Sequence, residues 1–245
     1  MTRHLLIWLV AVVGGAAGCT THRAAEGVHS ATNSRAIATF GAGVEMPATG
    51  SVTSEDLVPG RDQSRWTAVD GLLAPGSFHV ITQPSQQPGV SFTTATADLE
   101  TAHWSYREDG SVALVAVDSH PDNATSVFDP PLLLAPRQLN ADDEIRSEAR
   151  MKVVGISNPA SVRDRGTGTR TVRYVRDEEA VWRGAPTRAK VVEVEFVATL
   201  GTAKAERHST LWIVPGEGVV AERWSETITI LKLFTKKNSQ FAIRE

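Results

Sequence analysis

The stretch KVVEVEFVATL, residues 190–200, decides the fold class. Its apolar residues recur at every second position, as in Val192, Val194 and Phe196, while Glu193 and Glu195 fall between them. Because successive side chains of a β-strand point to opposite faces, this alternation predicts a strand with one buried face and one wet face. Such strands belong to antiparallel sheets, since parallel sheets are covered on both faces.

Further segments show a similar strand pattern, and turn residues separate several of them. The turns 108–111 and 215–218 each lie between two β-rich runs and predict hairpins. No long amphipathic helix is evident. We therefore expect an all-β fold, an antiparallel meander of about eight to ten strands that forms a curved sheet or half-barrel. The strands expected are 77–82, 101–107, 112–118, 147–156, 169–176, 188–200, 205–214 and 219–234.

The folded part is expected to span residues 62–245, with a division into two sub-sheets near 128–140. The run FDPPLLLAP, residues 128–136, is bounded by prolines. Proline cannot donate to a β-ladder, so this run is a poor candidate for a central strand and is expected to link the two sub-sheets.

The N-terminus has the three zones of a secretory signal peptide. Arg3 and His4 precede the apolar run 5–13, and small residues, 14–18, lead to Cys19, the one cysteine of the chain. The apolar run is too short for a spanning helix, which needs about 20 residues. We therefore expect residues 1–18 to be a signal peptide that is removed.

The end of this leader, Ala16-Ala17-Gly18-Cys19, resembles the lipobox of bacterial lipoproteins. The resemblance implies that Cys19 is acylated and becomes the first residue of the mature chain. Several acyl chains hold a protein on a membrane far more firmly than one. Thr20 in place of an aspartate implies export to the outer membrane, facing the periplasm. The alternative is a plain secreted protein with an unmodified cysteine.

Residues 19–61 are expected to be the lipidated cysteine followed by a flexible tether. The segment is rich in Ala, Gly, Ser and Thr and has no sustained apolar period. It could hold the domain clear of the membrane, and the short run 36–40 could dock locally on the domain.

The C-terminal half carries the stretch STLWIVPGEGVVAERW, residues 209–224. It weakly resembles the C-terminal meander of periplasmic half-barrel proteins of the group that includes the lipoprotein carriers LolA and LolB. The resemblance covers residues 147–245 and implies a half-barrel, but it gives no binding residue.

Two polar clusters are candidate sites. In VDSHPDN, residues 117–123, Asp118, His120 and Asp122 could hold a divalent ion, although Pro121 also marks an ordinary loop. In the basic hairpin 163–176, guanidinium groups could bind phosphate or sulfate, including lipid headgroups. The alternative is a solvated hairpin whose arginines pair with Glu193 and Glu195. These arginines are Arg163, Arg165, Arg170, Arg173 and Arg176.

Five tryptophans lie in the folded part and could line a groove, although large aromatic side chains are more often core residues. They are Trp66, Trp104, Trp182, Trp212 and Trp224. Motifs of nucleophilic and zinc-dependent hydrolases, GxSxG and HExxH, are absent from the sequence. A net charge of −3 with mixed signs gives no support for a nucleic-acid role.

These features predict a non-catalytic lipoprotein of the bacterial cell envelope, with no cofactor. Its partners would be the membrane, through Cys19, and an envelope protein or an apolar ligand. The alternative is a metal-dependent hydrolase that uses the loop containing Asp118, His120 and Asp122.

Overall fold

The computed structural model describes residues 39–58, 63–231 and 233–245. Within them the chain forms fifteen strands and one short helix, α1 (Ser54–Leu57). No helix among these residues has the length and apolar character needed to cross a bilayer. The strands are β1 (Val44–Met46), β2 (Ser51–Thr53), β3 (Gln63–Gly71), β4 (Gly76–Pro84), β5 (Phe92–Thr96), β6 (Glu100–Tyr106), β7 (Val112–Ser119), β8 (Ala124–Ala135), β9 (Gln138–Asn140), β10 (Glu144–Gly155), β11 (Val162–Trp182), β12 (Ala185–Leu200), β13 (Ala203–Val214), β14 (Gly218–Ile230) and β15 (Phe234–Arg244).

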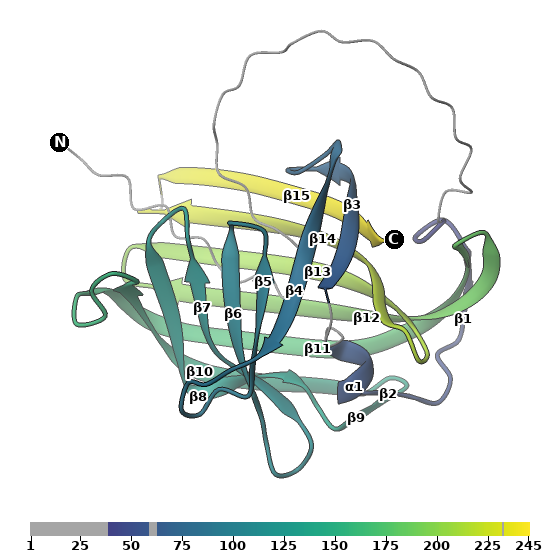
Figure 1. Ribbon diagram of the computed structural model, residues 1–245, viewed down its shortest axis with the longest axis horizontal. Coiled ribbons are helices and arrows are strands. Elements are labelled where there is room, and N and C mark those ends of the chain that lie inside the picture. Colours follow the sequence, from purple (N-terminus) through teal and green to yellow (C-terminus); the bar gives the residue numbers. More distant parts are fainter. Residues whose placement is uncertain (1–38, 59–62, 232) are drawn as a thin grey trace, which may run out of the picture.

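The main sheet closes on itself. Thirteen strands follow one another in the order β1-β11-β10-β8-β7-β6-β5-β4-β3-β15-β14-β13-β12, and β12 also pairs with β11. Because β1 pairs only with β11, the other twelve strands form a closed barrel in which neighbours are antiparallel. Strands β4 to β7 cross β11 to β15 at a steep angle (Figure 1). Strands β2 and β9 form a separate pair.

The expectation of an antiparallel all-β fold is confirmed, but the curved sheet or half-barrel of eight to ten strands is wrong. Each expected strand overlaps an observed one, although the expected strand 219–234 runs past the end of β14 at Ile230, and both expected hairpin turns join paired strands. The barrel closes through strands that the pattern missed. Strand β15, FTKKNSQFAIR, is mostly polar, and β5 is only five residues long, so neither shows a clear apolar alternation. Strand β3 was missed as well, and without β3 and β15 the expected sheet ends at β4 on one side and β14 on the other.

The expected link between two sub-sheets near 128–140 is also wrong, because Phe128 to Ala135 belong to strand β8. The two prolines of this strand, Pro130 and Pro131, lie where its pairing with β7 shifts register, between the partners of Ala116 and Leu114. Strand β10 pairs with β8 only up to Asp129. The irregularity places both prolines where no ladder hydrogen bond is required of them, which is how a central strand accommodates proline.

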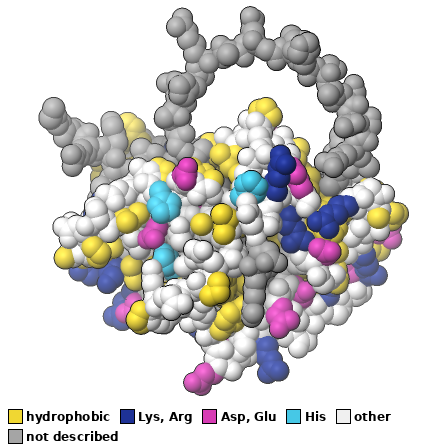
Figure 2. Space-filling model, in the orientation of Figure 1, with side chains coloured by type: hydrophobic (Ala, Val, Ile, Leu, Met, Phe, Trp, Pro, Cys, Tyr) yellow, Lys and Arg dark blue, Asp and Glu magenta, His cyan; other side chains and the backbone are white. Residues whose placement is uncertain are grey.

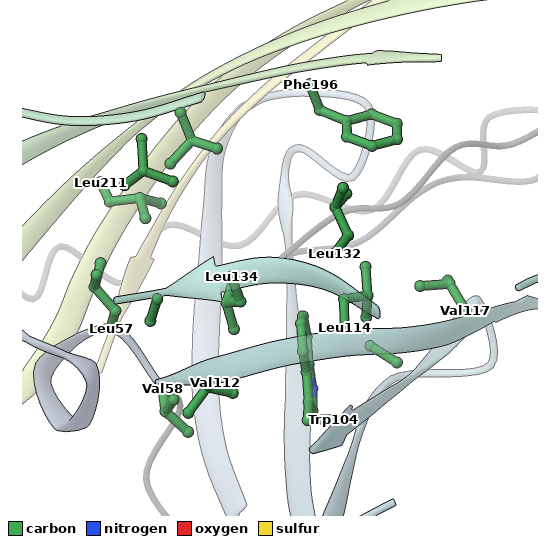
Figure 3. Close-up of a cluster of buried hydrophobic side chains, with 14 of the residues drawn as sticks. Leu57, Val58, Trp104, Val112, Leu114, Val117, Leu132, Leu134, Phe196 and Leu211 are labelled. Carbon is green, nitrogen blue, oxygen red and sulfur yellow. The ribbon is translucent and has the colours of Figure 1, made fainter. Parts of the chain in front are cut away.

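The core fills the barrel. Apolar side chains from β7, β8, β12 and β13 converge inside it, and Leu57 of α1 and the next residue, Val58, reach it as well (Figure 3). Trp104, Leu114 and Leu132 are each at most 1% exposed. The hydroxyl of Ser54 donates to the carbonyl of Gly110 at 2.8 Å, so α1 is fastened to the turn between β6 and β7. Helix α1 therefore covers one end of the barrel, which we call the α1 end.

The segment expected to be a tether up to residue 61 is in fact packed over its described part. Strand β1 extends the sheet beside β11, and β2 pairs with β9. Phe40 is 3% exposed against Trp212, and Val52 is fully buried. These apolar residues lie singly among small and polar ones, so the segment shows no period. The folded domain therefore begins by Phe40 rather than at residue 62.

Candidate functional site

The side chains of Asp118, His120 and Asp122, expected to share a metal ion, are each hydrogen-bonded to a different neighbour. The Nε2 atom of His103 lies 2.8 Å from Asp118 Oδ2, and the Thr125 hydroxyl donates to Asp118 Oδ1 at 2.6 Å. His120 is hydrogen-bonded to the Thr101 hydroxyl, and Asp122 accepts from Ser119. Burial of Asp118 favours its neutral form, yet the hydrogen bonds from His103 and Thr125 outweigh it and bring the pKa of this carboxyl below its ordinary value.

No group of three histidine, cysteine, aspartate or glutamate side chains suited to a metal ion occurs within the described ranges. Each of Asp118, His120 and Asp122 is engaged by its own neighbour, so the spacing of two along the chain does not bring their ligand atoms together. The structure thus offers no support for the metal-dependent hydrolase at this loop.

The five arginines expected on a basic hairpin all lie along a single strand, β11, and do not gather at one point. Arg173 pairs with Glu144 and Arg176 with Glu45, while Arg163 donates to the carbonyl of Asp122. Arg173 does face Glu193 across β11 and β12, as expected, although its ion pair is with Glu144, and Glu195 faces Thr171 rather than an arginine. Charges of both signs are interspersed over the face seen in Figure 2. Arg170 differs from the others, because it points into the barrel and is 4% exposed.

Arg170 belongs to a polar layer inside the barrel, made by Arg170, Arg207, Glu222, Trp224, Glu226 and Gln240. All six side chains are at most 4% exposed. They come from β11, β13, β14 and β15. These strands belong to the wall of the barrel that lies opposite strands β4 to β7 (Figure 1). Arg207 faces Glu226 across β13 and β14, and Trp224 faces Gln240 across β14 and β15.

Arg207 lies at the centre of the layer. Its guanidinium stands 4.2 Å from the ring centroid of Trp224, and its Nη2 atom lies 3.5 Å from Glu222 Oε1. Its Nε donates to Ser209 at 3.4 Å. These hydrogen bonds are long compared with the usual 2.7–3.2 Å range, so the layer is only loosely tied together.

Several polar atoms of the layer have no hydrogen-bond partner among the described residues. They are Arg170 Nε, Glu222 Oε2, Trp224 Nε1, and both Gln240 Oε1 and Gln240 Nε2. Burying a polar group without a partner costs about 1–3 kcal/mol, so native proteins rarely leave several together. A cluster of this kind calls for a specific explanation, such as a bound molecule.

Burial also shifts the acid–base equilibria of the layer. It raises the pKa of Glu222 to about 8, against the opposing attraction of Arg207. It lowers the pKa of Arg170 to about 9, and the nearby charge of Arg207 acts in the same direction. Burial likewise raises the pKa of Glu226. Strongly shifted groups that share one interior region mark a candidate functional site.

Sequence reasoning found only two residues of this layer, Arg170 and Trp224, and neither for this role. Glu222 directly follows the apolar run 219–221 of β14. Because apolar residues occupy successive positions in this run, the alternation of side chains does not show whether Glu222 points into the barrel or out of it. The signal available was Trp224 two residues later, which shares the inward face with Glu222. Of the other tryptophans, Trp66, Trp104 and Trp212 are at most 2% exposed and Trp182 is 7% exposed, as expected of core residues.

Comparisons with known proteins do not identify a family. No protein-family model matches the chain, and no curated protein matches it. Among solved structures, it is similar to the crystal structure of the hypothetical lipoprotein YmcC from Escherichia coli (K12), with 10% sequence identity and a TM-score of 0.40, over 76% of this chain and 87% of that one. Cys19 and the leader lie outside the described residues.

Proposed function

We propose that this chain is a non-catalytic lipoprotein of the bacterial cell envelope whose barrel binds a small polar ligand within the layer around Arg207. The envelope assignment depends on the leader and on Cys19, with the outer membrane as the expected location. The binding function depends on one observation, the set of buried unpartnered atoms on Arg170, Glu222, Trp224 and Gln240.

The chemistry of these atoms defines the ligand class. Arg170 Nε, Trp224 Nε1 and Gln240 Nε2 are donors and Gln240 Oε1 is an acceptor, while Glu222 Oε2 accepts when ionised and can donate in the protonated form that its raised pKa favours. A hydroxyl group can both donate and accept, so a molecule with several hydroxyl groups fits such a mixture better than a simple cation or anion. The apolar ligand expected from the sequence is less suited, because the apolar part of the barrel is filled by its own side chains.

A purely structural polar layer is the competing explanation, and substitution separates the two. Replacing buried polar groups with apolar groups of similar shape is often neutral or stabilising when the groups serve only the fold. Gln240→Leu removes both unpartnered atoms of that side chain at nearly constant shape. Under either explanation the variant should keep its fold, so the loss of a bound molecule from the variant, rather than a change in stability, separates the two.

Native mass spectrometry of the protein released from its own membrane tests the proposal. We expect the parent to carry a small molecule beyond the mass of the acylated chain, and Gln240→Leu to lose it. Gln138→Leu, at an exposed position of β9, is the matched control and should keep it. A parent observed only at the mass of the acylated chain, or an adduct retained by Gln240→Leu, would contradict the proposed site.

A further inference from the structure

The end of the barrel opposite α1 exposes apolar side chains at the turn between β14 and β15. Leu231, Leu233 and Phe234 are 59%, 78% and 68% exposed, the three most exposed large apolar residues of the described chain apart from Val44 at 65%. Strand β14 begins beside α1, where Gly218 lies close to the Asp56 carbonyl, and runs thirteen residues away from it. We call Leu231, Leu233 and Phe234 the apolar tip.

The backbone N–H groups of Leu231 and Leu233 are both hydrogen-bonded. The N–H of Leu231 donates to the carbonyl of Thr202 at 2.8 Å, and that of Leu233 donates to Ile230 at 3.0 Å. Leu231 has φ of 51°, in the left-handed region that a bulky side chain rarely adopts. Glycine or asparagine would suit this turn better, so the leucine is not explained by the conformation of the turn.

A basic hollow lies beside the apolar tip. Thr202, which accepts from Leu231, belongs to the turn between β12 and β13, and Gly201 of the same turn donates to the carbonyl of Arg165 at 3.2 Å. Arg165 lines a hollow of about 430 Å³ on the outer face of β8, β10 and β11, together with Lys152 and the ion pair of Arg150 and Asp129. The two features are therefore joined through adjacent turns.

Lys152 and Arg165 are direct neighbours across β10 and β11. Like charges opposite each other destabilise a sheet. Arg150 is paired with Asp129 at 2.8 Å, but neither the side chain of Lys152 nor that of Arg165 has an ion-pair or hydrogen-bond partner among the described residues. Two adjacent unpaired cations beside a hollow are suited to an anionic group.

We propose that this end of the barrel docks on a bilayer that contains anionic lipid. The apolar tip enters the interface, and Lys152 and Arg165 receive the phosphate of a headgroup. Apolar and aromatic side chains beside exposed cations are the combination that binds such surfaces, because burial of apolar area and attraction to anionic headgroups act together. The surface is separate from the interior polar layer, so either proposal can fail without the other.

Fluorescence quenching of the acylated protein in vesicles tests the docking. Phe234→Trp places an indole at the apolar tip, and brominated acyl chains in phosphatidylcholine–phosphatidylglycerol vesicles quench any indole that reaches them. The native tryptophans of the described barrel are at most 7% exposed and serve as the background. Tyr106→Trp is the matched control, because Tyr106 is 49% exposed beside the turn that contacts α1.

We expect quenching at position 234 and none at position 106. Removing Lys152 or Arg165 by alanine substitution should lower the docked-to-undocked ratio by about fivefold per cation on vesicles with phosphatidylglycerol, and leave it unchanged on phosphatidylcholine alone. Equal quenching at positions 234 and 106 would overturn the proposal. Unchanged quenching at position 234 after alanine substitution of both Lys152 and Arg165, on vesicles with phosphatidylglycerol, would also overturn it.

Discussion

The indole Nε1 of Trp212 donates a hydrogen bond to Glu178 Oε2 at 2.9 Å, from strand β13 to strand β11. The other oxygen of the same carboxylate accepts the backbone N–H of Gly41 at 2.6 Å. Glu178 is 1% exposed, and Phe40 packs on the ring of Trp212. One buried carboxylate thus fastens the N-terminal segment to the outside of the barrel.

Glu178→Ala should lower the free energy of unfolding by about 3 kcal/mol, because it leaves the Trp212 and Gly41 N–H groups without their acceptor. Denaturant melts measure the change. Glu179→Ala, at the next and exposed position, is the control and should alter stability by less than about 0.5 kcal/mol. Similar losses for both variants would mean that Glu178 does not hold the segment.

Leu57→Ala should cost about 3 kcal/mol, because Leu57 is 3% exposed and closes the α1 end of the core. Glu55→Ala, on the exposed side of the same helix turn, should be nearly neutral. Thermal melts of the two variants compare the faces of α1. Equal stability of Leu57→Ala and the parent would restore the expectation that residues up to 61 are only a tether.

Stability should fall as the pH rises from about 4.5 to 8. The pKa of Glu222 is raised from an ordinary 4.5 to about 8 in the folded protein, so over this window the folded state keeps a proton that the unfolded state has lost. Its stabilising contribution is complete below pH 4.5 and is lost as the pH passes 8. Glu226, whose pKa is also raised, acts in the same direction.

Glu222→Gln should flatten this dependence, since glutamine cannot ionise. One proton gives a slope of at most about 1.4 kcal/mol per pH unit, which denaturant melts at several pH values can resolve. Glu206→Gln is the matched control, because Glu206 lies on the outer face of the barrel in an exposed pair with Lys204. Parallel pH profiles for the parent and Glu222→Gln would show that Glu222 is not held neutral.

Cys19→Ser should release the protein from the membrane or leave it unprocessed, because the acyl chains that we expect on the cysteine would be absent. Membrane fractionation and intact mass measure the two outcomes. A serine variant that is processed and remains as firmly bound as the parent would contradict the lipoprotein assignment.

The sequence predicted the strands that alternate and missed those that do not. KVVEVEFVATL predicted β12 because its inward face is apolar along its whole length. Strand β15 turns Gln240 inward, and β14 turns Glu222 and Glu226 inward, so binary patterning fails at the polar layer. The sequence pattern missed the closure of the barrel and the polar layer for the same reason. Both depend on residues of β14 and β15 whose partners lie on other strands, far away along the chain.

Phe196 and Glu195 test the strand that decided the fold. Phe196 is 3% exposed, and its ring meets Phe128 of β8 edge to face, with centroids 6.2 Å apart. Phe196→Ala should therefore cost about 3–5 kcal/mol, a large part of the stability of an ordinary domain. Glu195 lies on the outer face, 4.0 Å from His208 in an exposed pair, so Glu195→Ala should cost under about 0.5 kcal/mol. Denaturant melts of both variants compare neighbours on opposite faces. Equal destabilisation would contradict the register, and a harmless Phe196→Ala that releases a bound apolar molecule would place an apolar ligand in the barrel instead of a packed core.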